Sequence, residues 1–249
     1  MTIDSESELA KLKAVGAVVA RTLRTMAAAL EPGMTTKELD DVGRQCLDAH
    51  GARSAPEITY GFPGATCISI HPAIAHGVPG DRAIAAGDLI NIDVSAEIEG
   101  SFADTGASFI VPPASPAKRA VCRATRKALN RAVGAARAGL PINVIGKTVE
   151  TFARKRGFSV IENLAGHGVG GALHEAPANV LSFYDGGDRR MLHEGMVIAV
   201  EPFLSTGASQ AEQGDDPWTL VTPPQFLTAQ YEHSIVVTRR APIVLTALA

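Results

Sequence analysis

The chain has 249 residues, of which 46% are hydrophobic and 20% are charged. A chain of this size and composition buries a large core as one domain or two tightly joined halves, and it is not disordered. Its net charge is −3, from 23 basic and 26 acidic residues, and no basic stripe is evident. We therefore expect neither a nucleic-acid partner nor a membrane surface.

Cysteine usage and the N-terminal segment indicate a cytoplasmic protein. The chain has three cysteines, Cys46, Cys67 and Cys122, which cannot all pair with one another and whose spacing matches no metal-binding motif. Unpaired cysteines are typical of a reducing compartment. The first residues, MTIDSESELAKLK, are polar and acidic, unlike a signal peptide. No apolar run approaches the length of about 18 residues that a membrane span requires. Nothing indicates an obligate interface, so we expect a monomer.

A group of helices followed by a group of strands occurs twice along the chain. A helix is predicted from about residue 5 to 30, and a second from the capping box of Thr35 and Glu38 to about Gly51. Short β-branched runs follow: CISI, LINIDV and ASFIV. Two more helices are predicted from Pro116 to about residue 138 and up to about residue 156. The strands FSVI, MVIAVEP and QYEHSIVVT complete the second series.

Two apolar segments match each other in detail. The segment AAGDLINIDV aligns with LHEGMVIAVEP at one constant offset, so that Gly87 corresponds to Gly195 and Asp93 to Glu201. In both segments an acid ends an apolar strand six positions after the glycine. The match predicts an internally pseudo-symmetric α/β unit, although two buried strands could share such an opening by coincidence.

Two acids are predicted to meet across a hairpin. Asp93 and Asp104 flank the turn Glu97–Gly100, and a turn centred between residues 98 and 99 places the two acids directly opposite each other. Directly opposed residues bring their Cβ atoms within about 5.5 Å. Like charges at that distance repel unless a cation lies between them, so the pair favours a divalent metal over two separate surface acids.

Two further acids flank apolar strands in the second half. Glu201 precedes Pro202, which cannot continue a central strand and so exposes the carboxylate at its end. Glu232 opens the strand EHSIVV, and alternation points His233 away from the side that Glu232 faces. A salt bridge is the simpler interpretation of each acid, but neither segment has a nearby Lys or Arg on the same face.

Histidines complete the candidate site. His167 lies among glycines in GHGVGG, His174 follows seven residues later, and His76 precedes a Gly turn. A lone histidine in such a loop is more often structural. Four carboxylates and at least one imidazole, however, suit divalent Mn, Fe, Co, Zn or Mg, and two ions that share bridging carboxylates would use all of them.

The segments around seven residues resemble the type I methionine aminopeptidases in order and approximate spacing, from about residue 5 to 245: His76, Asp93, Asp104, His167, His174, Glu201 and Glu232. The resemblance implies the pita-bread α/β (α+β) fold, with two pseudo-symmetric halves of helices and antiparallel sheet around a dinuclear metal site. It also implies a single catalytic domain over residues 1–249 that includes the N-terminal helices at about 5–51.

The resemblance also implies a role for each residue. Asp93 resembles the chelating carboxylate of one metal, and Asp104 and Glu232 resemble the bridging pair. The expected ligands of the second metal are His167 and Glu201. The cofactors would be two divalent ions such as Co, Mn, Fe or Zn. His76 and His174 resemble the two histidines that contact the scissile amide and the developing oxyanion, and Glu201 resembles the general base.

Three departures from the family pattern concern the pocket for the first residue. His71 replaces the usual Asn, Leu173 replaces an aromatic residue, and the segment 59–63 is shortened or shifted. Phe62 and Trp218 are candidate walls of that pocket, or else ordinary core aromatics.

The expected activity is removal of N-terminal methionine from polypeptides, with N-terminal peptide segments as partners. Three alternatives stay open: an X-Pro aminopeptidase or prolidase of the same fold, a paralogue with an altered first-residue preference, and a metal-free binding module.

Overall fold

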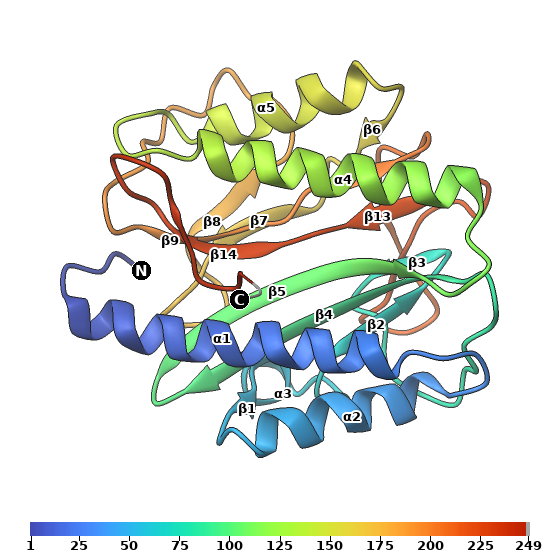
Figure 1. The fold of residues 1–249 in the computed structure, drawn as a ribbon. Helices are drawn as coiled ribbons and strands as arrows, with labels where there is room; N and C mark the ends of the chain where they lie inside the picture. The colour runs from blue at the N-terminus through green and yellow to red at the C-terminus, as the bar shows by residue number, and fades with distance from the viewer. Residues whose placement is uncertain (248–249) are drawn as a thin grey trace.

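The computed structural model describes residues 1–247. The strands lie between two pairs of helices, one pair at the bottom of the view and one at the top (Figure 1). The helices are α1 (Glu6–Ala29), α2 (Thr36–Asp48), α3 (Ala55–Tyr60), α4 (Pro116–Ala135) and α5 (Asn143–Arg154). None of the helices among residues 1–247 is long and apolar enough to cross a membrane.

Within residues 1–247 the strands form four small antiparallel sheets. The first half contains β1 (Arg53–Ser54), β2 (Cys67–Ile70), β3 (Ala73–Ala75), β4 (Leu89–Ile98) and β5 (Ser101–Ile110). The second half begins with β6 (Ser159–Val160), β7 (Ala165–Gly168), β8 (Glu175–Leu181), β9 (Val197–Val200) and β10 (Phe203–Ser205). It ends with β11 (Glu212–Gln213), β12 (Leu220–Val221), β13 (Thr228–Gln230), β14 (His233–Val236) and β15 (Ile243–Val244).

The two helix pairs pack on two separate cores. The predicted capping box opens α2, where the Thr35 side chain accepts from the Glu38 amide and the Glu38 side chain accepts from the Thr35 amide. Apolar residues of α1 and α2 pack against β2 and β4, whereas those of α4 and α5 pack against β9 and β14. Each helix thus buries one face against its own sheet.

The two halves repeat each other, as the internal match predicts. The first residues of β4 and β9 are separated by the same number of positions as the matched glycines. The first residues of α2 and α5 are separated by one position fewer. Gly87 and Gly195, the matched glycines, have φ values of 90° and 81°. The pair α1–α2 with β4 and β5 thus corresponds to α4–α5 with β9 and β14.

The β4–β5 hairpin differs from its predicted register by two residues. Ile98 pairs with Ser101 across the turn, and Asp93 therefore pairs with Gly106, not with Asp104. The expectation of directly opposed acids was wrong because the turn is the two-residue Glu99–Gly100, in which both residues have positive φ. Asp93 and Asp104 still share one face, as diagonal neighbours, for which Cα atoms typically lie about 7–8 Å apart.

The predicted strand QYEHSIVVT is broken into β13 and β14, and MVIAVEP ends at β9 as Pro202 requires. The register is the same on both sides of the break, with His233 opposite Val200 and Gln230 opposite Phe203. This continuity places Glu201 opposite Glu232 in the break between the two strand pairs.

The two halves join where β5 runs beside β14. The Ser234 hydroxyl donates to the Asp104 carbonyl at 2.8 Å and accepts from the Asp104 amide at 2.9 Å. The Glu232 amide donates to the Gly106 carbonyl at 2.9 Å, and the Thr105 hydroxyl donates to the Glu232 carbonyl at 3.0 Å. These bonds hold the acids of the two halves against each other.

Candidate metal centre and substrate cavity

The structure gathers the predicted acids and His167 at the seam between the halves. Side-chain ligand atoms of Asp104, His167 and Glu232 all lie within 4.8 Å of one another. His167 Nε2 lies 3.8 Å from Asp104 Oδ2 and 3.5 Å from Glu201 Oε1. Only 2% of Glu232 and 6% of Asp104 are exposed, so these carboxyl groups are withdrawn from water. Asp93 lines the same cavity.

The acids of this cluster have no Lys or Arg partner among residues 1–247. Within residues 1–247, no Lys or Arg forms an ion pair with Asp93, Asp104, Glu201 or Glu232. Burial raises the pKa of Asp93 to about 6 and, together with the repulsion between these acids, raises the pKa of the other three well above their ordinary values. In the described part of the chain, the buried Asp104 Oδ1 and Glu232 Oε1 have no hydrogen-bond partner.

The donor set fits divalent metal ions. Unpartnered, buried carboxylate oxygens are costly, and oxygen-rich groups that include one imidazole are the ligands that such ions use. Asp104 and Glu232 each carry one such oxygen, and a carboxylate oxygen of each converges with a ring nitrogen of His167, so a cation between them would offset the repulsion of the carboxylates.

The His167 ring is oriented as a ligand. His167 lies on β7, a strand and not the loop that its glycine neighbours suggested. A Cβ at Gly166 would lie 2.3 Å from the Ala199 carbonyl oxygen, so glycine is needed for the close approach of β7 to β9. His167 Nδ1 donates to the Gly168 carbonyl at 3.0 Å, which leaves a lone pair on Nε2, the atom that faces the acids. Burial lowers the pKa of His167 to about 3, so the ring is neutral.

Two residues outside the predicted set orient Glu232. Gln230 Nε2 donates to Glu232 Oε2 at 3.0 Å, and Asn91 Nδ2 donates to Gln230 Oε1 at 2.8 Å. Gln230 and Glu232 are two residues apart, the spacing of side chains on one face of a strand, which is the signal that could have identified Gln230. This chain of hydrogen bonds leaves Glu232 Oε1 free.

Three of the four acids, Asp93, Asp104 and Glu201, line a cavity of about 290 Å³ together with His167. Trp218 and Phe62, the predicted pocket walls, meet edge to face in it, with ring centroids 5.3 Å apart. Leu173 also lines the cavity, whereas His71 does not and instead bonds the Pro224 carbonyl through Nε2 at 2.9 Å. The cavity is lined by Pro56, Tyr60, Phe62, Cys67, His76, Asp93, Ser95, Asp104, His167, Leu173, His174, Glu201 and Trp218.

Two histidines stand at the exposed side of this cavity. The His174 ring lies 4.0 Å from that of His167, centroid to centroid, and Tyr60 Oη lies 2.6 Å from His174 Nδ1. His76 has a φ of 51°, a strained value for a residue with a side chain. Partial burial lowers the pKa of both His76 and His174, which keeps the rings neutral near pH 7.

Tyr60 and Pro56 lie on α3, a helix that the sequence-based prediction missed. Its signals are present: Ser54 caps the helix by accepting from the Glu57 amide, and Gly61 ends it in the left-handed conformation. Six residues are too few to show helical periodicity. The segment 59–63 therefore combines the end of a helix with a turn that leads Phe62 into the cavity.

Comparisons with known proteins agree with this geometry. The model of metallopeptidase family M24 matches residues 10–239. Methionine aminopeptidase 2 of Bacillus subtilis strain 168 is 44% identical over 249 residues, which cover 100% of both chains. The crystal structure of a methionine aminopeptidase from Thermotoga maritima superposes with a TM-score of 0.95 at 29% identity, again over 100% of both chains.

A prolidase from Pyrococcus furiosus shares the fold with a TM-score of 0.79 at 21% identity, covering 100% of this chain and 66% of the prolidase. The fold is thus the predicted pita-bread arrangement. The chain belongs to metallopeptidase family M24 and, within it, to the methionine aminopeptidases.

Proposed function

We propose that this protein removes the N-terminal methionine from polypeptides by metal-dependent hydrolysis. The observation that carries the proposal is a group of four acids and one neutral histidine at a cavity with an aromatic wall, where no Lys or Arg within residues 1–247 pairs with the acids. The full-length similarity to methionine aminopeptidases supports it.

The proposed metal ligands are the carboxylates of Asp93, Asp104, Glu201 and Glu232 and the Nε2 atom of His167. The five side chains would hold two divalent ions, because one ion seldom uses four carboxylates. Such ions, when bound, supply Lewis-acid polarisation of a carbonyl and lower the pKa of a water molecule.

The protein's own residues would then move the protons. Glu201, with a pKa raised by burial, is the proposed general base, which takes a proton from the attacking water and returns it to the leaving amine. His174 would donate a hydrogen bond to the developing oxyanion, a contribution typically worth about 3–4 kcal/mol. His76 would contact the leaving nitrogen.

The apolar side of the cavity is the proposed pocket for the methionine side chain. Phe62 and Trp218 provide an aromatic wall, and Leu173 provides an aliphatic one. His76 and His174 would contact the scissile amide at the edge of this pocket. An unbranched thioether side chain suits such a mixed wall.

A peptide comparison tests the proposal. Metal-loaded protein should release methionine from Met-Ala-Ser and should leave Ala-Pro-Ala intact, with Co, Mn, Fe and Zn supplied in turn. Cleavage of Ala-Pro-Ala alone would instead indicate an X-Pro aminopeptidase or prolidase. A protein that binds no metal and cleaves neither peptide would be a binding module, and a preference for another first residue would indicate a paralogue.

We further propose that residues 1–249 act as one catalytic domain, as a cytoplasmic monomer. The hydrogen bonds between β5 and β14, and the presence of ligands from both halves in one cavity, support a single unit. The three free cysteines are consistent with a reducing compartment.

A further inference from the structure

The net charge of −3 conceals a strong asymmetry. Residues 111–149 contain eight of the 23 basic residues and none of the 26 acidic ones, so the rest of the chain carries 15 basic and 26 acidic residues, a charge of −11. Five of the eight lie exposed on α4 and form what we call the α4 stripe: Arg119, Arg123, Arg126, Lys127 and Arg131. The expectation that the chain has no basic stripe was therefore wrong.

The placement of these charges disfavours the helix that carries them. Like charges four residues apart destabilise a helix, and the stripe contains three such pairs: Arg119/Arg123, Arg123/Lys127 and Lys127/Arg131. The first turn of α4 also contains Lys118 and Arg119 without any acid, although the helix dipole disfavours positive charge there. Arg119 donates to the Ala114 carbonyl and Arg131 lies over the Phe152 ring, but neither contact removes a positive charge. Local rules broken in this way, with no ion pair to offset them within residues 1–247, indicate a functional surface.

The charges of the stripe are not neutralised within the protein. Among the residues that the structure describes, no member of the stripe forms an ion pair. The corresponding helix of the other half, α1, mixes Lys11, Lys13, Arg21 and Arg24 with Glu6 and Glu8. The basic surface is therefore a property of one half and not of the repeated fold.

We propose that the α4 stripe binds the phosphate backbone of a nucleic acid. Four of its five members are arginines, whose guanidinium groups bind phosphate in a bidentate geometry. From Arg119 to Arg131 the helix rises about 18 Å, the length of several nucleotides of one strand. The described part of α4 has no large exposed apolar side chain to insert into a bilayer, which favours nucleic acid over a membrane.

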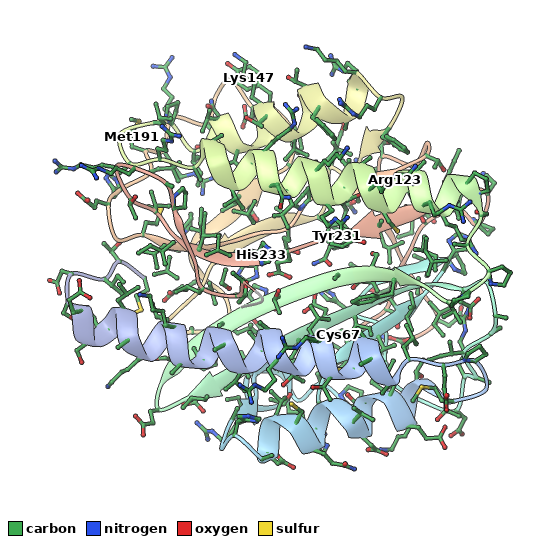
Figure 2. The ribbon with its side chains drawn as sticks, in the orientation of Figure 1. Cys67, Arg123, Lys147, Met191, Tyr231 and His233 are labelled. Atoms are coloured by element: carbon green, nitrogen blue, oxygen red, sulfur yellow. The ribbon has the colours of Figure 1, made fainter. Side chains whose placement is uncertain are left out.

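A hollow beneath the stripe adds to this surface. It has a volume of about 290 Å³ and is lined by Arg119, Arg123 and Arg126 together with Tyr231 and other residues, which leaves room for a phosphate between the guanidinium groups. Figure 2 labels Arg123 on α4 and Tyr231 beside it. Tyr231 lines this hollow, whereas its neighbour Glu232 belongs to the acid cluster, so the two sites lie on opposite faces of the same segment. A bound nucleic acid would leave the catalytic cavity open.

The test is fluorescence anisotropy with a labelled poly(U) oligonucleotide and the full chain. We expect binding that weakens with salt, with a slope of log Kobs against log[salt] of about −3 to −4 for five contacts to a single strand. Arg119→Gln/Arg123→Gln/Arg126→Gln/Lys127→Gln should weaken binding more than about tenfold and lower the slope by about 3.

The matched control removes four charges from the other half: Lys11→Gln/Lys13→Gln/Arg21→Gln/Arg24→Gln. It should keep most of the affinity for poly(U). Both variants should stay folded by thermal melting and release methionine from Met-Ala-Ser at the wild-type rate, so failure of this proposal leaves the proposed activity untouched.

Three results would overturn the proposal: no poly(U) binding by the wild type at low salt, equal weakening in both variants, or preferential binding of phosphatidylserine vesicles through the α4 stripe.

Discussion

Replacing one acid of the cluster should stabilise the metal-free protein. Asp93→Asn keeps the shape of the side chain and removes a negative charge that pairs with no Lys or Arg within residues 1–247. Burial raises the folded-state pKa of Asp93 from 3.8 to about 6, so the folded state binds this proton more tightly than the unfolded chain does. The ionised carboxylate therefore costs stability above pH 6 and costs none below about pH 4.

The size of the effect follows from the pKa. A difference of about 2 pKa units, at 1.36 kcal/mol each, makes the metal-free variant up to about 3 kcal/mol more stable than the wild type at pH 8. This difference in stability is an upper bound, because Asp93 is only partly buried and water screens its charge. The loss of repulsion on Asp104 acts in the same direction.

Urea unfolding with a chelator, at pH 4 and pH 8, measures the difference. The stabilisation should be present at pH 8 and absent at pH 4, and added Mn²⁺ should stabilise the wild type more than the variant. Asp81→Asn, at an exposed position, controls for the loss of one negative charge. A variant that is no more stable than the wild type at pH 8, or that gains as much at pH 4, would refute the reasoning.

Three substitutions test individual roles. Asp104→Asn should nearly abolish turnover and lower the metal content measured by mass spectrometry; unchanged values would remove Asp104 from the ligands. His174→Ala should lower kcat by a few hundredfold with the metal content intact, as for loss of an oxyanion donor worth about 3–4 kcal/mol, whereas loss of metal would make it a ligand. Tyr60→Phe should lower kcat about fivefold at constant KM, because the hydroxyl that holds Nδ1 of His174 is worth about 1 kcal/mol. The ¹⁵N chemical shifts of the His174 ring should show the proton on Nε2 in the wild type and a mixture of the two tautomers in Tyr60→Phe. Identical spectra would show that Tyr60 does not set the tautomer of His174.

Features encoded by neighbouring residues were predictable from the sequence. The capping box of Thr35 and Glu38 was found because both partners lie within one helical turn. The acids at Asp93 and Glu201 were noticed because charge in an apolar strand needs a partner, wherever that partner comes from. Their repetition in two matched segments predicted the two halves that the structure shows.

Features that depend on distant contacts were not predictable. The register of the β4–β5 hairpin depended on which two residues of Glu97–Gly100 form the turn, and several choices were compatible with the alternation. The contact between Tyr60 and His174 joins residues 114 apart, and α3 is too short for its periodicity to be seen. The basic stripe on α4 was hidden by a net charge summed over the whole chain.

The sequence by itself determined the donor types and their periodic placement, because residue chemistry and backbone repeat are local properties. Only the tertiary structure decided that Glu201 and Glu232 meet in one strand break, and that Nε2 of His167 faces them. That convergence is set by the packing of β5 against β14 and the hydrogen bonds between them, which join residues about 130 positions apart.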